Sequence, residues 1–427
     1  MTNASTEVRR VTIDVRSLVE TSRVHGRLYT DPVVFEEELE RIWYGSWVYI
    51  AHVSEVPRPG DYRRKRVGFQ ELVVNRDLEG GLHVFFNRCP HRGNLVTRDQ
   101  ASNSSGFRCP YHGWTFSAEG ALIGVPSKDA YGERFEDVRD RLCLSEVEHL
   151  GTYAGFIFGA LNDPGISLEA HLGPARFAFD QLVGLSPAGE LDLNGGWLRH
   201  QSRCNWKIAV ESFLDHYHPR FVHHSMFRAT GATLEEMRAN SVADLGGGHT
   251  ELGFSHHNVE VGKPLAWAGN VPAEKLGDYV PAMEASYGAE EAQRRLIAGP
   301  PHVMVFPNLC IAQMNLIVFH PTSPSECVQE TAPVLLTDAP ELNRRTLRQC
   351  EGAMGPAGLI IADDAEIGER TQVGLMARSP EWLELSRGLE RDRPAGDGVV
   401  RSPDESDETT HRGFWRHYAD VITGRLE

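Results

Sequence analysis

The sequence predicts an α+β protein of two domains, an all-β domain followed by a larger domain that mixes helices and strands. The length of 427 residues exceeds the size at which a single hydrophobic core usually stops growing. The pattern also changes along the chain, from short apolar stretches separated by Gly and Pro to longer helical and extended stretches. The turn sequence Asn162-Asp-Pro-Gly separates the two patterns. We therefore expect an N-terminal segment at 1–45, an all-β domain at 46–165 and the mixed domain at 166–427.

The N-terminal segment is predicted to be helical in patches. Between Asp31 and Trp43, the apolar residues Phe35, Leu39 and Ile42 lie three or four positions apart. This spacing places them on one face of a helix, and we expect that face to pack against the mixed domain.

The all-β domain is predicted from short stretches of β-branched and aromatic residues that turn residues separate. The expected strands are 47–50, 71–75, 82–87, 106–109, 114–116 and 152–159. In the mixed domain we expect strands at 249–255, 302–306 and 309–320 and helices at 206–218, 289–297, 340–350 and 362–376. Residues 391–409 are rich in Asp, Glu, Ser, Gly and Pro, a composition typical of an exposed loop.

The composition is that of an ordinary globular protein, with 41% hydrophobic and 24% charged residues. The formal net charge of −16 argues against a nucleic-acid partner, because such binding needs a basic surface. We find no apolar stretch long enough to cross a membrane and no apolar leader, so we expect a soluble, cytoplasmic protein. The seven cysteines suggest no framework of paired disulfides, and reduced thiols are expected.

Two short runs carry the first candidate metal site: Cys89-Pro-His91-Arg-Gly and Cys109-Pro-Tyr-His112-Gly-Trp. Each run offers one thiolate and one imidazole, and 17 residues separate His91 from Cys109. Two cysteines on one iron and two histidines on the other are the ligands of a Rieske [2Fe–2S] centre. We expect both runs at hairpin tips of the all-β domain. Such a cluster usually delivers electrons to another site in the protein.

Zinc is the alternative metal, because two cysteines and two histidines also form structural zinc sites. Zinc fingers usually pair Cys with Cys and His with His, whereas each run here mixes the two. Gly93 and Gly113, near the histidines, suit tight loops whose backbone N–H groups point at bridging sulfides. The pattern favours the iron–sulfur cluster.

A second candidate metal site lies where four histidines, His216, His218, His223 and His224, fall within nine positions. Mononuclear Fe(II) that binds dioxygen is typically held by two histidines and one carboxylate, which leaves coordination positions open. His218 and His223 can supply the imidazoles if the helix bends or ends near Pro219. The pair His218 and His224 stays possible.

Together, the motifs C-P-H-R-G, C-P-Y-H-G-W, N-W-K-x3-E and D-x-Y-H-x4-H resemble the large (α) subunit of Rieske non-haem iron ring-hydroxylating oxygenases. This family includes naphthalene, biphenyl, benzoate and terephthalate dioxygenases. Two later stretches, which begin Gly355-Pro-Ala-Gly and Glu408-Thr-Thr-His, extend the resemblance over nearly the whole chain. The resemblance implies a Rieske domain followed by a catalytic domain with an antiparallel sheet flanked by helices, the helix-grip or START-like arrangement.

The resemblance also implies the metal ligands. The cluster would be held by Cys89, His91, Cys109 and His112, and the mononuclear iron by His218, His223 and Asp364. Asp215 matches a bridging aspartate that hydrogen-bonds an iron-ligand histidine and a Rieske histidine of the adjacent subunit.

Three neighbours of the expected iron ligands are assigned lesser roles. Asp363 and Glu366 would be surface charges on the helix that carries Asp364. Ser212 follows Glu211 where the naphthalene type has asparagine. A longer-range contact from this position to the iron is therefore in doubt.

Candidates for the substrate pocket are mainly apolar, aromatic or thioether side chains, which suit a flat ring, although each would equally serve in core packing. They are Phe221, Met226, Phe227, His302, Met304, Gln313, Met354 and Ile360. Ile360 stands where the naphthalene type has tryptophan, so a cavity of different shape is expected. The strand at 311–320 lacks the arginine with which terephthalate-type relatives hold a carboxylate. The sequence leaves acid and neutral rings open, with a lean toward a substituted aromatic acid.

The resemblance implies the terminal oxygenase of a multicomponent system, in which electrons pass from NAD(P)H through a reductase, with or without a ferredoxin, to the Rieske centre and then the iron. With O2, the family typically makes a cis-dihydrodiol from an aromatic ring. A trimer is expected, either α3β3 with a small β subunit or α3. The alternative enzyme is a Rieske monooxygenase that hydroxylates or demethylates. The non-enzyme alternative, a Rieske ferredoxin, would lack His218, His223 and Asp364.

Overall fold

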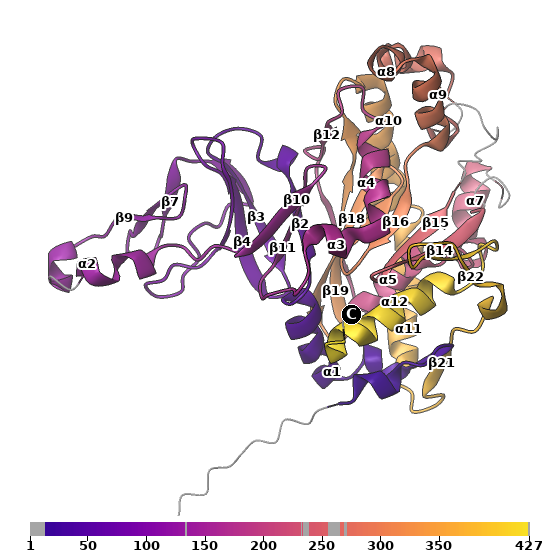
Figure 1. The fold of residues 1–427 in the computed structure, drawn as a ribbon, viewed down its shortest axis with the longest axis horizontal. Helices are drawn as coiled ribbons and strands as arrows, with labels where there is room; N and C mark the ends of the chain where they lie inside the picture. The colour runs from indigo at the N-terminus through magenta and orange to yellow at the C-terminus, as the bar shows by residue number, and fades with distance from the viewer. Residues whose placement is uncertain are drawn as a thin grey trace, which may run out of the picture.

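The computed structural model describes residues 13–132, 135–231, 233, 239–254, 265–268 and 271–425. The chain forms an elongated lobe of small sheets, which we call the β lobe, and a larger lobe built on one wide sheet, which we call the large lobe (Figure 1). None of the helices within these residues combines the length and apolar character that a membrane crossing requires.

The β lobe contains three small antiparallel sheets, with strand orders β10-β11-β2, β5-β4-β3-β6 and β7-β8-β9. Their strands are β2 (Val48–His52), β3 (Asp61–Val67), β4 (Gln70–Arg76), β5 (Leu82–Phe86), β6 (Ala101–Asn103), β7 (Gly106–Arg108), β8 (Thr115–Ser117), β9 (Leu122–Gly124), β10 (His149–Tyr153) and β11 (Phe156–Ala160). The short helix α2 (Phe135–Val138) lies at the outer end of the lobe (Figure 1). The expected all-β character is confirmed.

Two expectations for this lobe are wrong in detail. The stretch 152–159 is not one strand, because Ala154 and Gly155 adopt positive φ and turn β10 back onto β11. Of the two candidate metal loops, only that of Cys109 is a hairpin tip, between β7 and β8. The loop of Cys89 connects β5 to β6, which pair with different strands, β4 and β3.

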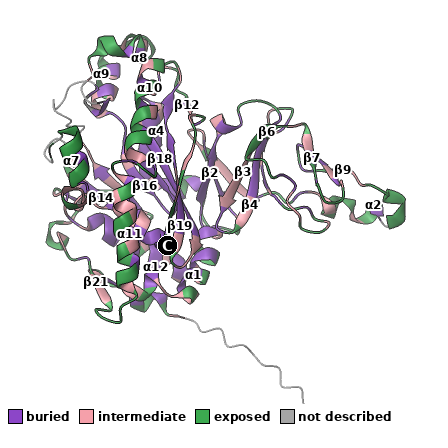
Figure 2. Cartoon of the chain, turned by 180° about the vertical axis from the view of Figure 1, so that it is seen from behind, coloured by how far each residue is buried: buried purple, intermediate pink, exposed green. Residues whose placement is uncertain are grey.

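Within the described residues, nine strands form the sheet of the large lobe, in the order β13-β19-β18-β17-β16-β15-β14-β23-β22, and every neighbouring pair is antiparallel. The strands are β13 (Leu198–Ser202), β14 (Ser241–Gly246), β15 (His249–Gly253), β16 (His302–Val305), β17 (Leu309–Ala312), β18 (Asn315–Ser323), β19 (Glu326–Pro333), β22 (Arg393–Pro394) and β23 (Val400–Ser402). Most of the central strands are buried on both faces (Figure 2).

Helices cover both faces of this sheet, as expected. Successive side chains of β16 point to opposite faces of the sheet, and both faces are apolar. Met304 belongs to the hydrophobic core on one face, whereas Val303 and Val305 belong to the core on the other. The first face carries α5 (Trp206–Leu214), α11 (Ile361–Leu375) and α12 (Thr409–Thr423). The second carries α3 (Leu168–Leu172), α4 (Arg176–Val183), α8 (Tyr279–Tyr287), α9 (Ala289–Ala298) and α10 (Pro340–Gln349).

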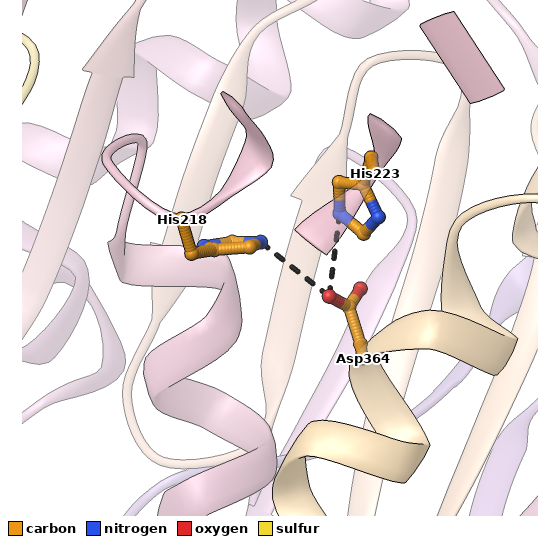
Figure 3. Close-up of side chains that lie close together, drawn as sticks. All are labelled: His218, His223 and Asp364. Atoms are coloured by element: carbon orange, nitrogen blue, oxygen red, sulfur yellow. Dashed lines mark ion pairs between the residues drawn. The ribbon is translucent and has the colours of Figure 1, made fainter. Parts of the chain in front are cut away.

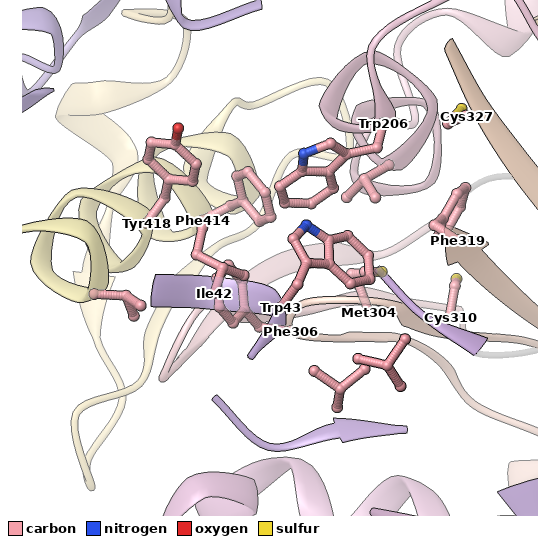
Figure 4. Packing of buried hydrophobic residues seen from close by; sticks show 14 of the residues in the cluster. Ile42, Trp43, Trp206, Met304, Phe306, Cys310, Phe319, Cys327, Phe414 and Tyr418 are labelled. Carbon is pink, nitrogen blue, oxygen red and sulfur yellow. The ribbon is translucent and has the colours of Figure 1, made fainter. Parts of the chain in front are cut away.

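The N-terminal segment packs on the first face of the sheet. Helix α1 (Pro32–Glu38) begins at Asp31, whose side chain accepts a hydrogen bond from the backbone N–H of Val33 at 2.9 Å. The chain continues as a π-helical turn to Trp43, whose ring lies 5.2 Å from that of Trp206 on α5. Figure 4 shows these two rings with Phe414 and Tyr418 of α12 in one core.

Three expectations for the large lobe are wrong. The helix expected at 206–218 ends at Leu214, and the separate short helices α6 (Pro219–Val222) and α7 (His224–Thr230) follow. The strand expected at 309–320 is a hairpin of β17 and β18 that turns at Gln313, which adopts φ +56°. The exposed loop expected at 391–409 contains β23, which pairs with β14, and the buried Asp407.

Short elements complete the fold. Strand β1 (Arg23–His25) pairs with β21 (Trp382–Glu384), and β12 (Leu191–Asp192) pairs with β20 (Leu335–Leu336). The helices expected at 289–297, 340–350 and 362–376 are confirmed as α9, α10 and α11, within one or two residues at each end.

Candidate metal centres

The loops of Cys89 and Cys109 share one backbone pattern. In each loop the cysteine N–H donates to a carbonyl five positions later, that of Asn94 at 2.8 Å and that of Trp114 at 2.8 Å. The glycine four positions after each cysteine donates its N–H back to the cysteine carbonyl, at 2.9 Å for Gly93 and 3.0 Å for Gly113. Both glycines adopt a positive φ, +72° and +71°, which glycine reaches without strain. The structure thus builds two similar tight loops from the two motifs.

The four candidate cluster ligands come together with the thiols inside and the imidazoles outside. Cys89 and Cys109 are 1% and 3% exposed, whereas His112 is exposed. The rings of His91 and His112 lie 4.7 Å apart, and the ring of Trp114 stacks on His91 at 4.7 Å. The four residues that the sequence proposes as cluster ligands therefore lie close enough together to share one site.

The donor chemistry of this site suits an iron–sulfur cluster. Burial raises the pKa of the Cys89 thiol, and the neighbouring Cys109 thiol raises it further. The backbone N–H groups of His91 and Arg92 bond to the Cys89 sulfur and oppose that rise in pKa. Two thiols that are close enough to interact can share one iron, and N–H groups aimed at sulfur are the contacts that stabilise a thiolate cluster.

The second constellation lies at the end of α5. Asp215 caps that helix at its C-terminal end, and the chain turns there because the Asp215 carboxylate accepts the backbone N–H of Tyr217 at 2.6 Å. His218 then precedes Pro219, the first residue of α6, and His223 lies between α6 and α7. Pro219 suits the first turn of a helix because its missing N–H costs no hydrogen bond there.

Asp364 completes the set from the first turn of α11, where the helix dipole favours a carboxylate. Its Oδ1 atom lies 3.4 Å from Nε2 of His218 and 3.3 Å from Nε2 of His223 (Figure 3). The three candidate ligand atoms all lie within 4.8 Å of one another. Two imidazole nitrogens and one carboxylate oxygen at these separations can occupy one face of an iron ion.

The charges at this site are strongly coupled. Burial lowers the pKa of His218, but its contacts with Asp215 and Asp364 outweigh burial and raise the pKa to about 9. Burial likewise opposes ionisation of both carboxyl groups, yet hydrogen bonds from His218 lower the pKa of Asp215 and, with those from His223, that of Asp364. In the metal-free protein the two carboxylates therefore hold a proton on His218, in the place that a metal cation would fill.

The alternative ligands lie elsewhere. His224 is exposed at the start of α7, whereas His223 is 4% exposed and faces Asp364. His216 contacts Glu405 through Nδ1 at 3.1 Å. Asp363 lies 3.6 Å from the Nδ1 atom of His223, which has no hydrogen-bond partner among the described residues. This geometry favours His223 over His224 as the second imidazole ligand.

Glu211 and Ser212, the residues next to the expected bridge, serve the fold. The carboxylate of Glu211 accepts hydrogen bonds from the Tyr29 hydroxyl at 2.8 Å and from the indole N–H of Trp415 at 2.7 Å. The Ser212 hydroxyl donates to the Ile208 carbonyl of its own helix at 3.4 Å.

Two of the eight pocket candidates lie beside the iron constellation. His302, on β16, donates through Nε2 to the carbonyl of Phe213 at 3.3 Å, just before Asp215. Burial, with a smaller contribution from His216, lowers the pKa of His302 to about 4, so its imidazole is neutral. The carbonyl of Ile360 accepts the backbone N–H of Asp364 at 3.2 Å, which places Ile360 at the start of the helix that carries this ligand.

The other candidates differ in their surroundings. Phe221 on α6 is 64% exposed, and Met226 and Phe227 lie on α7, Met226 being buried. Met304 is fully buried in the core of Figure 4, and Met354 is partly buried against the same core. Gln313 lies at the turn after β17 and donates its N–H to the Pro301 carbonyl at 2.9 Å, next to His302. Their roles in substrate binding stay predictions.

Sequence reasoning missed one partner of this region, Glu405. It lies in the stretch expected to be an exposed loop, yet its carboxylate contacts His216 at 3.1 Å and accepts from Arg220 at 3.3 Å. No local pattern connects residues 189 positions apart, so only the fold reveals this contact.

Comparison with protein families assigns both lobes. Residues 46–146 match the Rieske [2Fe-2S] domain, and residues 192–424 match the ring-hydroxylating α subunit (catalytic domain) family. The chain therefore belongs to the Rieske ring-hydroxylating oxygenases and is a large-subunit member of that oxidoreductase family. A Rieske cluster and a mononuclear non-haem iron are the cofactors of this family, and a reductase supplies the electrons.

Individual relatives span several chemistries. The chain is 30% identical over 387 residues to the 2-halobenzoate 1,2-dioxygenase large subunit of Burkholderia cepacia. The aligned region covers 86% of this chain and 80% of that protein. It is 29% identical over 428 residues to the N,N-dimethyl phenylurea N-demethylase subunit alpha of Sphingobium sp. (strain YBL2), with 93% and 91% covered.

Among solved structures, naphthalene 1,2-dioxygenase from Rhodococcus sp. bound to indole is similar, with a TM-score of 0.81 and 27% identity over 95% of each chain.

Proposed function

We propose that this chain is the terminal oxygenase subunit that dihydroxylates a substituted aromatic ring with O2. The observation that carries this proposal is the convergence of His218 Nε2, His223 Nε2 and Asp364 Oδ1 beside Asp215. Three protein ligands on one face leave coordination positions for dioxygen and substrate. When bound there, ferrous iron supplies the binding and reduction of dioxygen.

The residues of the chain orient these ligands. The Asp215 carboxylate lies 3.1 Å from Nδ1 of His218 and can accept its proton, so Nε2 keeps the lone pair that a metal needs. His302 stays neutral and bonds to the carbonyl of Phe213, which ties β16 to the end of α5. These contacts support a rigid iron site beneath the end of α5.

We propose that the electrons arrive from the Rieske loops of a neighbouring subunit. In Figure 1 the tip of the β lobe, near β7 and β9, points away from the large lobe, which contains α5 and α11. Tyr111, beside His112 in the second cluster loop, is 63% exposed, as a docking tip requires. A trimer, either α3 or α3β3 with a small β subunit, would bring one tip to each Asp215. The reaction would take place in the cytoplasm, where NAD(P)H reduces the reductase.

A substituted aromatic acid or a related arene is the proposed substrate. The 2-halobenzoate dioxygenase supports the acid, and the naphthalene dioxygenase supports a hydrocarbon. The neutral imidazole of His302 and the side chain of Gln313 could recognise a polar substituent through hydrogen bonds rather than through an ion pair.

N-demethylation is the second candidate function, because the N-demethylase is almost as similar to this chain as the dioxygenase. The purified holoenzyme, supplied with a matched reductase and NADH, should be given aromatic acids, hydrocarbons and N-methylated phenylureas. A cis-dihydrodiol with matching oxygen uptake supports dioxygenation, whereas formaldehyde release supports demethylation. If the intact holoenzyme consumed no oxygen with any aromatic compound, the proposal of an aromatic substrate would be rejected.

A further inference from the structure

A cavity of 80 Å³ lies between the two lobes, and its lining residue Val318 belongs to the core on the face of the sheet opposite to α5. The β lobe forms one wall through β2, β3 and β4, and the large lobe forms the other through β13, β18 and β19. The first wall belongs to the stretch that matches the Rieske domain, and the second to the stretch that matches the catalytic domain.

The register of the sheet sets the wall on the large lobe. Arg199 of β13 pairs with Glu330 of β19, which pairs with Val318 of β18, so three side chains stand in one row. His320 follows two positions after Val318 and therefore lies on the same face. These side chains meet the cationic run Arg64-Lys65-Arg66 of β3 across the cavity.

Several buried polar atoms in the lining of the cavity have no hydrogen-bond partner within the described residues. Among the described residues, the Tyr49 hydroxyl, the indole N–H of Trp197 and Nδ1 of His320 are buried without a hydrogen bond, whereas Nε2 of His320 lies 3.4 Å from the Glu330 carboxylate. Tyr49 is 1% exposed and His320 is 9% exposed. Buried polar groups are rarely left unpaired, because such a group loses its hydrogen bonds to water without gaining others. Such groups can bond to water or to a polar ligand that enters the cavity.

The charges of the lining favour an anion. Four cationic side chains line the cavity, and three of them have a carboxylate partner: Arg64 pairs with Glu71 at 3.3 Å, Lys65 with Glu55 at 2.5 Å and Arg199 with Glu330 at 3.7 Å. The fourth is Arg66. In the described part of the chain no carboxylate lies within 4 Å of Arg66. This excess of positive charge occurs in a chain with a formal net charge of −16.

Glu330 does not remove this excess. Burial opposes its ionisation, but His320, Lys65 and Arg199 outweigh burial and lower its pKa to about 2. Glu330 is therefore ionised, and its negative charge is opposed by these three neighbours.

We propose that the cavity between the lobes binds one small oxyanion of the phosphate type, held by Arg66, Tyr49, Trp197 and His320. An indole N–H can only donate and an arginine can only donate, so these groups select an acceptor. The volume admits several water-sized groups but is smaller than the cavity of about 150 Å³ that holds benzene in another protein. An aromatic substrate is therefore excluded, and the bound anion would link the Rieske domain to the catalytic domain of the same chain.

The test is calorimetric titration of the full-length holoenzyme with inorganic phosphate, at constant ionic strength set by sodium chloride. We expect one saturable site per chain. Tyr49→Phe, which removes only the hydroxyl oxygen, and Arg66→Gln should each weaken binding about tenfold or more. Arg344→Gln is the matched control, because Arg344 lies on the surface of α10 and pairs with Glu341 at 2.6 Å. This control should bind phosphate like the unmodified protein.

Acetate and sulfate titrations distinguish the kinds of oxyanion. Tighter binding of acetate than of phosphate would overturn the assignment to a phosphate-type anion, whereas tighter binding of phosphate or sulfate than of acetate would support it. The visible spectrum of the Rieske cluster reports that each variant is folded. No saturable binding, or binding that neither Tyr49→Phe nor Arg66→Gln weakens, would overturn the proposal.

Discussion

Asp215 and His218 form a pair in which the carboxylate lies 3.1 Å from Nδ1 of the imidazole, on the opposite side of the ring from Asp364. The Asp215 carboxylate also accepts the backbone N–H of Tyr217, so its orientation is fixed by the turn that ends α5. One carboxylate therefore sets both the path of the chain and the direction in which His218 points its Nε2 atom.

Replacing Asp215 by asparagine should slow turnover while both metal centres stay loaded. The amide keeps the size of the side chain but loses the charge that fixes the tautomer of His218. We expect turnover to fall about 10- to 100-fold or more, which product formation in a reconstituted assay measures. Iron content and the Rieske spectrum serve as controls. Normal turnover would reject the positioning role of Asp215.

Asp364→Ala should remove the mononuclear iron and leave the Rieske cluster in place. The substitution removes the oxygen that contacts Nε2 of both His218 and His223. Iron analysis should show loss of the mononuclear iron alone. Glu366→Gln, on the exposed side of the same helix, is the matched control, since Glu366 pairs with Arg370. Unchanged iron content in Asp364→Ala would move the ligand assignment to another carboxylate.

Iron binding should strengthen with pH. The pKa of His218 in the metal-free protein is raised from 6.5 to about 9. The proton on His218 therefore stabilises the metal-free fold below pH 6.5, and this stabilisation is lost as the pH rises through 9. Iron binds only the neutral imidazole of His218. The apparent affinity of the site for iron should therefore rise by up to about tenfold per pH unit between pH 6.5 and about 9. Anaerobic titration with Fe(II) measures the affinity, and a flat profile would contradict the charge coupling.

Gly93→Ala should weaken the first cluster loop. A Cβ atom there meets only the flexible Arg88 side chain, at 3.4 Å, so the cost comes from the positive φ of +72°. We expect a loss of about 1–2 kcal/mol and a lower cluster content per chain, measured by visible absorbance. Gly374→Ala, near the end of α11 with open space around it, should leave the cluster intact. Equal cluster content in both variants would show that the loop tolerates the substitution.

Glu38→Gln should destabilise the large lobe severely. The Glu38 carboxylate pairs with Lys207 and accepts the Tyr418 hydroxyl, and Glu38 and Lys207 are both fully buried. Removing one partner leaves a buried charge, which costs about 3–5 kcal/mol. Denaturant unfolding of the holoenzyme measures this loss, and adding Lys207→Met should restore part of it. Arg16→Gln, which breaks an exposed pair with Asp420, is the control and should cost about 0–1 kcal/mol.

The candidate metal sites could be proposed from the sequence because most of the expected ligands lie in short, chemically unusual motifs. Cys89 with His91 and Cys109 with His112 are local pairs, and His218 with His223 is another. Asp364 came only from the family resemblance, since nothing in its own surroundings separates it from Asp363. The fold then distinguishes the two, because the carboxylate of Asp364 lies at Nε2 of both histidines.

Two of the expectations that proved wrong concern a turn that lacks Gly, Pro or Asn, and a strand that forms only by pairing with a strand distant in the sequence. Gln313 adopts a left-handed conformation that the sequence does not signal, so β17 and β18 were expected as one strand. Strand β23 is polar and short, and it is a strand only because β14, far earlier in the chain, pairs with it. The cavity between the lobes could not be predicted either, because its two walls come from separate domains.

Segments near both ends of the described chain contact α5, the helix that leads to Asp215. Glu38, before the β lobe, contacts Lys207, and Trp415, in the last helix, contacts Glu211. During biosynthesis this helix thus lacks its final support until the C-terminal helix has left the ribosome. We therefore expect iron binding by His218 and His223 to require that the C-terminal helix has packed against α5.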